Sequence, residues 1–210
     1  MKATSPKNLE WLGKTAILTA FLTALLYASG WSYGVHHFNL YDVGLLGLKL
    51  PKEVFFLYGF MAWKSHWLFA LLLFFAAIGV SSLPQRWPHM AYLPTLLHVL
   101  AILTIPIMII IGIQLGGMRA KELYDSQKEA GFPRFPTVKV WLKEKSAIPE
   151  ESGIKQELAA GCYRLLLNND KFLYLFKVTP EEGHKRHPTV AIPTSETAGW
   201  QRHSANGCQT

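Results

Sequence analysis

The stretch from Leu93 to Leu115 is the feature that most constrains this chain, because it runs for 23 residues without a formal charge. At about 1.5 Å per residue, a helix of that length crosses a hydrocarbon layer of about 30 Å. A soluble core helix of the same length normally carries a polar face. The polar side chains here are only Thr95, His98, Thr104 and Gln114. The stretch therefore predicts a transmembrane helix.

Two other uncharged stretches precede it, Thr15–Gly34 with 20 residues and Trp67–Leu83 with 17. Each is close to the length that a membrane crossing requires. The expected fold is an α-helical membrane protein with three transmembrane helices, followed by a small C-terminal, mostly-β soluble domain. The helices are expected at about 15–34, 67–83 and 93–115. The expected domains are a transmembrane region (1–118), a charged juxtamembrane helix or linker (119–136) and a β-rich domain (137–210).

The stretch 43–63 admits more than one structure. Pro51 followed by Lys52 and Glu53 indicates a helix start, with proline in the first turn and an acid beside the positive end of the helix dipole. The apolar residues Val54–Trp63 are too few to cross a bilayer alone. The segment therefore lies at the membrane interface, begins a long second helix, or enters the membrane as a broken fourth segment.

Small residues recur at helical spacing in two of the predicted helices. Ala16, Ala20 and Ala24 are four residues apart and share one helix face. Gly112 and Gly116 form a GxxxG pair. Faces of this kind let helices approach closely in lipid. We therefore expect close helix packing at these five positions.

Two ionisable residues are candidates for an intramembrane polar site. His98 lies about 8 Å inside its predicted helix, where it can reach the headgroups or bond a neighbouring helix. Lys64 would lie about 20 Å along a second helix that began at Pro51, and a lysine buried at that depth marks a functional site. If the helix enters the bilayer at Trp67 instead, Lys64 is an ordinary interfacial anchor.

The composition changes where the third apolar stretch ends, and the C-terminal part predicts strands. Apolar and polar residues alternate with a period of two in Thr137–Lys143. Cys162–Asn168 and Phe172–Val178 predict a hairpin joined by an Asn-Asn-Asp turn. Thr189–Ile192 predicts another short strand, and Ser146–Glu157 a polar linker. Four or five strands in so short a region predict a small β module.

The sequence contains no recognised catalytic, cofactor-binding or metal-binding pattern. His36 and His37 are adjacent, but the further histidine pairs of membrane di-iron sites do not accompany them. The two cysteines, Cys162 and Cys208, form no CxxC pair and match no zinc-ligand spacing. There is no phosphate-binding glycine loop and no nucleophile elbow. We expect no enzymatic activity, no cofactor and no metal.

The net charge of +7 does not come from one basic run, because many basic residues flank the predicted spans. A charged fringe on the lipid bilayer accounts for it, and no nucleic-acid partner is expected. Orientation signals conflict across three crossings. Lys2, Lys7 and Lys14 favour an N-terminus in the cytosol, whereas Arg119 and Lys121 favour a cytosolic C-terminal domain. The C-terminal domain is expected in the cytosol.

Four short segments carry a family resemblance: Gly30-Trp31-Ser32-Tyr33, Phe38-Asn39-Leu40, Leu50-Pro51-Lys52-Glu53 and Val190-Ala191-Ile192-Pro193. They resemble a loose group of small bacterial multi-pass inner-membrane proteins with a short C-terminal β domain. The resemblance implies a location in the bacterial cytoplasmic membrane. For some of that group it implies a role as an immunity or accessory protein for membrane-acting toxins, and it assigns no active residue.

Two functions of different classes follow. The first is a non-catalytic membrane protein that binds a partner, either another membrane protein or a cytosolic one. The alternative is a homo-oligomeric membrane effector or channel gated through its β domain, with Pro106 as a hinge. The two functions predict different effects of one substitution. Gly116→Leu should weaken self-assembly if that face joins copies of the chain.

Overall fold

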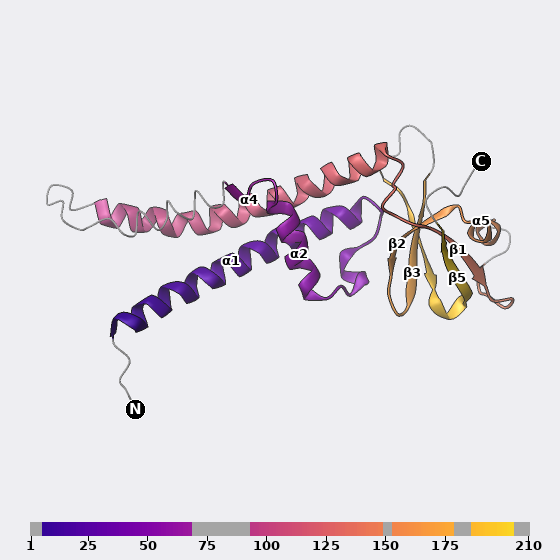
Figure 1. Ribbon diagram of the computed structural model, residues 1–210, viewed down its shortest axis with the longest axis horizontal. Helices are drawn as coiled ribbons and strands as arrows, with labels where there is room; N and C mark the ends of the chain where they lie inside the picture. The colour runs from indigo at the N-terminus through magenta and orange to yellow at the C-terminus, as the bar shows by residue number, and fades with distance from the viewer. Residues whose placement is uncertain (1–5, 69–92, 149–152, 179–185, 204–210) are drawn as a thin grey trace, which may run out of the picture. The chain divides into compact units, whose positions relative to one another are not determined.

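The structure, a computed structural model, describes residues 6–68, 93–148, 153–178 and 186–203, without the side chains of 6–12, 14 and 93–102. The chain forms two compact units. One combines Met1–His36 with Leu50–Ala120, and the other combines His37–Lys49 with Lys121–Thr210. Figure 1 traces the elements of each.

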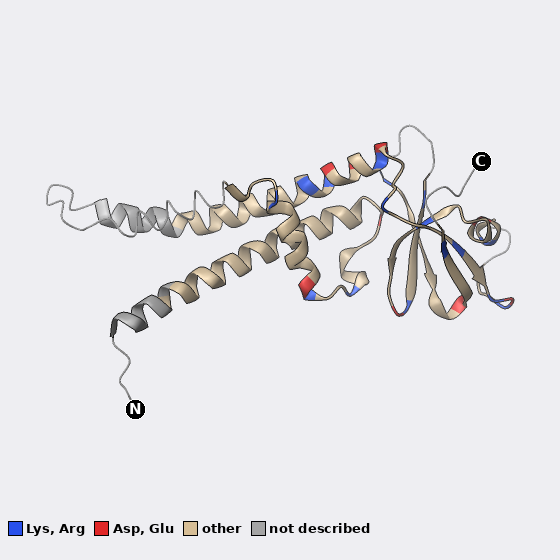
Figure 2. Ribbon diagram, viewed as in Figure 1, with Lys and Arg blue, Asp and Glu red and all other residues tan. Residues whose placement is uncertain are grey.

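In the described residues, three helices build the first unit: α1 (Pro6–Asn39), α2 (Lys52–Trp63) and α4 (Leu93–Glu129). The last turns of α1 and α4 continue into the second unit. Figure 2 shows α1 without a charged side chain from Thr15 onward, and charges on α4 gather toward its C-terminal end. Pro106 lies inside α4, which continues through it.

Among the described residues, two helices are long and apolar enough to cross a membrane, Thr15–Asn39 and Leu103–Glu129. They overlap the first and third predicted spans. The second predicted span, 67–83, lies almost wholly outside the described residues, so the structure gives two candidate spans where the sequence predicts three.

Helices α1 and α4 run in the same direction where they pack, since later residues of α4 contact later residues of α1. Gly112 lies against Leu25 and Ser29, and Gly116 against Ser29 and Tyr33. A Cβ at Gly116 would collide with the carbonyl oxygen of Ser29. Glycine is therefore required for the backbones to approach this closely.

Helix α2 crosses α1 at a second pair of glycines. A Cβ at Gly30 would meet the backbone of Phe55, and a Cβ at Gly59 would meet that of Leu26. The crossing brings the rings of Tyr33 and Tyr58 to 4.8 Å between centroids. Side chains of all three helices then share one buried cluster, which contains Leu25, Ala62, Trp63 and Met108.

The second unit is built on a five-stranded antiparallel sheet with the order β4-β3-β2-β1-β5. Its strands are β1 (Thr137–Leu142), β2 (Tyr163–Asn168), β3 (Phe172–Lys177), β4 (Thr189–Pro193) and β5 (Thr197–His203). Short helices η1 (Leu45–Leu48), α5 (Ile154–Ala160) and η3 (Thr194–Glu196) complete it. The core beneath α5 contains Val138, Val140, Leu158, Tyr163, Leu165, Leu173, Leu175 and Ile192.

Two elements of this unit differ from the sequence expectations. Residues 154–157, expected in a polar linker, begin helix α5, because Ile154 and Leu158 share a helix face that covers the sheet. No strand was predicted at 197–203, where the short helix η3 leads into β5. Strand β5 is held by its register with β1, which pairs Val140 with Trp200.

Candidate functional site

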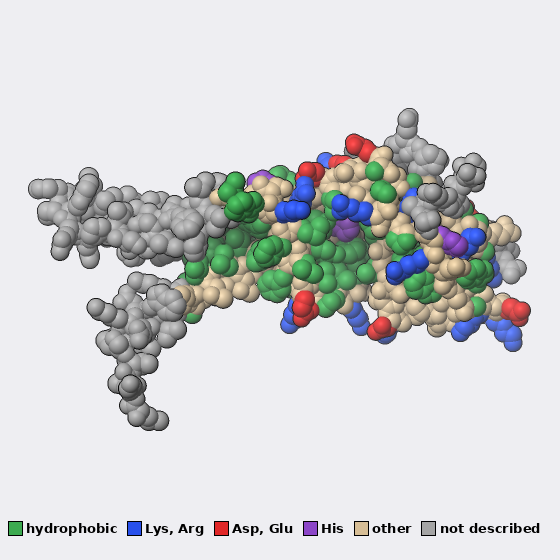
Figure 3. Space-filling model, viewed as in Figure 1, with side chains coloured by type: hydrophobic (Ala, Val, Ile, Leu, Met, Phe, Trp, Pro, Cys, Tyr) green, Lys and Arg blue, Asp and Glu red, His purple; other side chains and the backbone are tan. Residues whose placement is uncertain are grey.

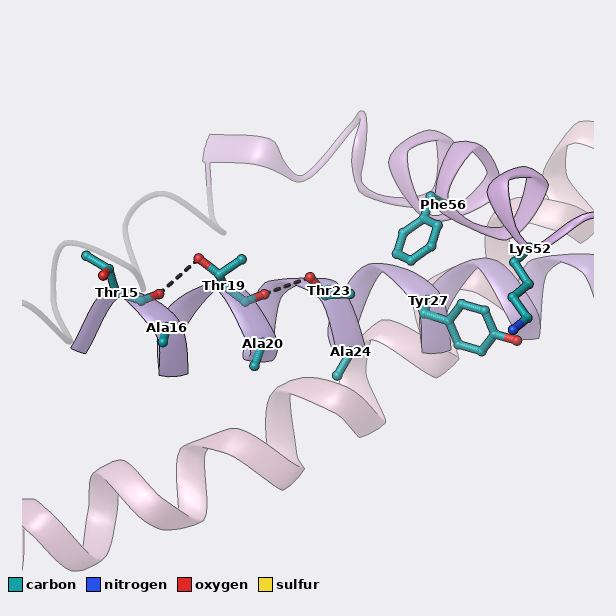
Figure 4. A pocket seen from close by; sticks show the side chains of 9 residues that line it. All are labelled: Thr15, Ala16, Thr19, Ala20, Thr23, Ala24, Tyr27, Lys52 and Phe56. Carbon is teal, nitrogen blue, oxygen red and sulfur yellow. Dashed lines mark hydrogen bonds between the residues drawn. The ribbon is translucent and has the colours of Figure 1, made fainter. Parts of the chain in front are cut away.

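An open groove of about 930 Å³ follows one face of α1 and is bounded at one end by α2 (Figure 4). Alanines and threonines of α1 line its length, and three larger side chains stand at the α2 end. The lining residues are Thr15, Ala16, Thr19, Ala20, Thr23, Ala24, Tyr27, Lys52 and Phe56.

The threonine hydroxyls in the groove donate within their own helix. Thr19 Oγ1 donates to the carbonyl oxygen of Thr15 at 2.9 Å, and Thr23 Oγ1 donates to that of Thr19 at 2.7 Å. Back-bonding of this kind satisfies the hydroxyl inside the helix. These two threonines therefore have no hydroxyl donor left for a molecule lying in the groove.

The α2 end of the groove is aromatic and carries one cation. The ring of Tyr27 lies 5.7 Å from both Phe55 and Phe56, centroid to centroid. Lys52 is exposed and lines this end of the groove together with Tyr27 (Figure 4). No hydrogen-bond or ion-pair partner of its ammonium occurs in the part of the chain that the structure describes.

The residues predicted to pack helices fall on two different surfaces. Ala16, Ala20 and Ala24 are exposed and line the groove. Gly112 and Gly116 are buried against α1 of the same chain. The structure therefore separates an internal contact from an open face.

Of the two predicted intramembrane residues, the structure describes the side chain of Lys64 only. His98 belongs to α4, and its side chain lies outside the description. Lys64 is exposed at the C-terminal end of α2.

A buried polar contact joins the three helices near Ser29, whose side chain is fully buried. Ser29 Oγ donates to the carbonyl oxygen of Leu25 at 2.7 Å and accepts from Trp63 Nε1 at 3.0 Å. Ser32 Oγ donates to the carbonyl oxygen of Ile113 at 2.7 Å. These bonds satisfy hydroxyls that would be costly to bury unpaired, and they fix the register of α1 against α4.

In the second unit, aromatic rings pack on the face of β3 that points away from α5. Phe132 and Phe176 are fully buried, with centroids 5.2 Å apart and planes nearly perpendicular. Edge-to-face contacts of this kind stabilise beyond their buried area. The cluster, called the aromatic joint below, consists of Tyr41, Tyr124, Phe132, Phe135, Phe176 and His187.

The segment before β4 ties the aromatic joint to the turn after α1. The backbone N–H of His187 donates to the carbonyl oxygen of Leu40 at 3.0 Å. Arg186 pairs with Asp42 at 3.3 Å across an exposed contact. On the other side of the joint, Arg164 donates to the carbonyl oxygens of Phe132 and Phe135.

A second polar cluster lies at the edge of the α5-covered core. Glu157 accepts from Lys177 Nζ at 2.7 Å and from the Tyr163 hydroxyl at 3.0 Å. These hydrogen bonds, with that from Lys177 the larger, lower the pKa of Glu157. Burial and then the bond to Glu157 raise the pKa of Tyr163 to about 12. The arrangement is a structural ion pair.

Strand β5 forms one edge of the sheet and pairs with β1 along six positions. No strand among the described residues pairs with its other side. Trp141 of β1 is 44 % exposed beside this edge, opposite Gly199. Arg202 lies over the ring of Trp200, 5.4 Å from its centroid.

Metal-binding geometry does not occur among the described residues, where no group of three or more His, Cys, Asp or Glu side chains converges. Cys162 is disulfide-bonded, and the chain has one other cysteine, Cys208.

Sequence reasoning did not single out the residues at the α2 end of the groove, Tyr27, Lys52 and Phe56. Lys52 was recognised only as part of a helix start. Its position beside Tyr27 depends on the Gly30–Gly59 crossing, which involves glycines 29 positions apart without a shared motif.

These features define a helical chain with a C-terminal antiparallel β module and, among the described residues, two candidate membrane spans. No family model, no curated protein and no solved structure matches the chain.

Proposed function

We propose that this protein is a non-catalytic integral membrane protein that acts by binding a protein partner through its β module. The observation that carries this proposal is the open β5 edge with Trp141, Trp200 and Arg202 around it. An edge strand offers unpaired backbone groups to an extended segment of another protein. Tryptophan and arginine are also the residue types most enriched at binding hot spots.

Membrane insertion is supported by the side chains that the helices leave exposed (Figure 3). Ile17 is 68 % exposed, Phe60 70 % and Ile110 57 %. Large apolar side chains at this exposure suit a lipid surrounding, and they are costly in water.

The parallel packing of α1 and α4 supports three crossings. Two parallel helices that both span a bilayer have their N-terminal ends on the same side, so the chain between them crosses an odd number of times. The uncharged stretch Trp67–Leu83 supplies that crossing.

The disulfide at Cys162 supports an orientation opposite to the sequence expectation. Disulfides persist in oxidising compartments and are rare in the cytosol. The β module is therefore assigned to the outer side of a bacterial cytoplasmic membrane. The N-terminus is then cytosolic, as Lys2, Lys7 and Lys14 favour.

Cysteine labelling in intact cells tests the orientation. The Cys208→Ser variant leaves Cys162 as the single thiol, and a membrane-impermeant maleimide should label it without lysis. In a second variant, Gly13→Cys with both native cysteines replaced by serine, labelling should require lysis. The reverse pattern would place the module in the cytosol.

Site-specific photo-crosslinking tests the partner proposal. A photoreactive residue at Gln201, on the β5 edge, should give one discrete adduct, whereas the same residue at Lys171, in the β2–β3 hairpin, should give none. An adduct of twice the chain mass would identify a second copy and favour the oligomeric effector. Equal diffuse labelling at both positions would count against a binding edge.

A further inference from the structure

We infer that the groove on α1 binds one anionic phospholipid, with an acyl chain along the Ala/Thr face and the phosphate at Lys52 and Tyr27. This inference rests on the membrane insertion proposed above and not on the partner of the β module. It assigns a binding role to the exposed face that contains Ala16, Ala20 and Ala24.

The dimensions of the groove suit a lipid chain. Thr15 and Tyr27 are 12 positions apart in α1, which is about 18 Å of helix. One leaflet of a bilayer contributes about 15 Å of hydrocarbon, half of the total. An acyl chain lying along α1 therefore reaches from the α2 end of the groove to its far end.

The lining is apolar along its length and polar at one end only. The hydroxyls of Thr19 and Thr23 donate within the helix, and the alanines present methyl groups. Lys52 and Tyr27 both line the α2 end (Figure 4). A hydrocarbon chain with one anionic head matches this distribution, because an ammonium with no ion-pair partner among the described residues attracts a phosphate.

Aromatic residues at the α2 end of the groove indicate that this end lies at the level of the lipid headgroups. The rings of Tyr27, Trp31 and Phe55 lie within 6.4 Å of one another, centroid to centroid. Tyrosine and tryptophan concentrate at the level where hydrocarbon gives way to headgroups.

A partner helix is the competing occupant, and two side chains of α2 obstruct it at one end of the groove. A helix with side chains is about 10 Å wide. Packed along α1 beyond Tyr27, it would meet Phe56 and Lys52 of α2, which line that end of the groove. A lipid chain ends at its headgroup and does not need to pass.

Native mass spectrometry of the full chain, released from nanodiscs, tests the inference with two lipids of identical acyl chains. We expect one retained phosphatidylglycerol, with retention above that of phosphatidylcholine by about fivefold, the value of one lysine near an anionic surface. Lys52→Ala should remove the preference and Lys52→Arg should keep it. Lys64→Ala, which changes an exposed lysine at the other end of α2, should leave it unchanged.

A bulky residue in the groove provides an independent arm. Ala20→Phe should reduce retention of both lipids, whereas Ile17→Phe, a change at an exposed position outside the groove lining, should not. Equal retention of the two lipids, or equal losses in Lys52→Ala and Lys64→Ala, would overturn the inference, as would a dimer that Ala20→Phe dissociates. If the chain stayed soluble without detergent, the proposed membrane insertion itself would fail.

Discussion

The hydroxyl oxygen of Tyr124 lies 2.6 Å from Nδ1 of His187, and both side chains are almost completely buried. The phenol donates when the imidazole carries its proton on Nε2. Their contact joins the C-terminal turns of α4 to the segment that leads into β4 within the second unit. It is a long-range polar bond inside the aromatic joint.

Removing the Tyr124 hydroxyl should destabilise the second unit. Tyr124→Phe leaves the ring in place but deprives Nδ1 of its partner, at a cost of about 1–3 kcal/mol. Chemical unfolding in detergent measures the loss. Tyr174→Phe is the matched control, because no hydrogen bond of its hydroxyl is found among the described residues, and it should change stability by much less. Equal losses would contradict the assigned role of the bond.

Enlarging Gly116 should disrupt the packing of α1 on α4 within one chain. In Gly116→Leu the new side chain collides with the backbone of Ser29, and overpacking of this kind costs about 1–3 kcal/mol or more. The melting temperature in detergent should fall. Gly13→Leu has open space around it and serves as the control. A change in oligomeric state without a change in melting temperature would assign Gly116 to a contact between copies.

Arg164 should be required for the turn between α4 and β1. Its guanidinium donates to the carbonyl oxygen of Phe132 at 3.0 Å and to that of Phe135 at 2.8 Å. Phe132 is a buried non-glycine residue with φ of 57°, so the turn needs such support. Arg164→Met should cost about 2–4 kcal/mol of unfolding free energy, whereas Lys171→Met in the exposed hairpin should cost little. Similar values for both would show that the two bonds do not support the turn.

The stability of the second unit should fall in acid partly because of Glu157. Its pKa is lowered in the folded chain, so its contribution is complete above the unfolded pKa and disappears as the pH falls through the folded pKa. The carboxylate is partly exposed, which limits the effect to about 1 kcal/mol or less. The free energy of unfolding should fall less between pH 7 and pH 3 in Glu157→Gln than in the native chain. An equal fall in the two proteins would show that the Glu157 carboxylate does not contribute to the pH dependence.

Tyr163 should produce the opposite dependence in alkali. Its pKa is raised to about 12, so the neutral phenol stabilises the fold below the ordinary pKa near 10, and this contribution is lost as the pH rises toward 12. Absorbance at the tyrosinate band, as a difference between the native chain and Tyr163→Phe, isolates this one group. A difference curve with its midpoint near 10 would contradict the burial and the bond to Glu157.

The strands and the long helices follow from local pattern. The period of two in 137–143 and the Asn-Asn-Asp turn predict β1 and the β2–β3 hairpin, each close to its observed bounds. Uncharged length predicts the apolar parts of α1 and α4. Local pattern does not predict helix α5 or strand β5, because each is stabilised by a part of the chain distant in sequence. Helix α5 packs on the sheet, and β5 pairs with β1.

By itself, the sequence determined where hydrocarbon-length helices and alternating strands occur, since both depend on spacing along the chain. Only the tertiary structure decided which small residues are buried and which face is open. Gly112 and Gly116 lie against Ser29, while Ala16, Ala20 and Ala24 line a groove that Lys52 reaches from another helix. Both sets carry the same small-residue signal. The glycines of α4 have another helix packed against them, and the alanines of α1 do not. This difference depends on how the three helices pack together.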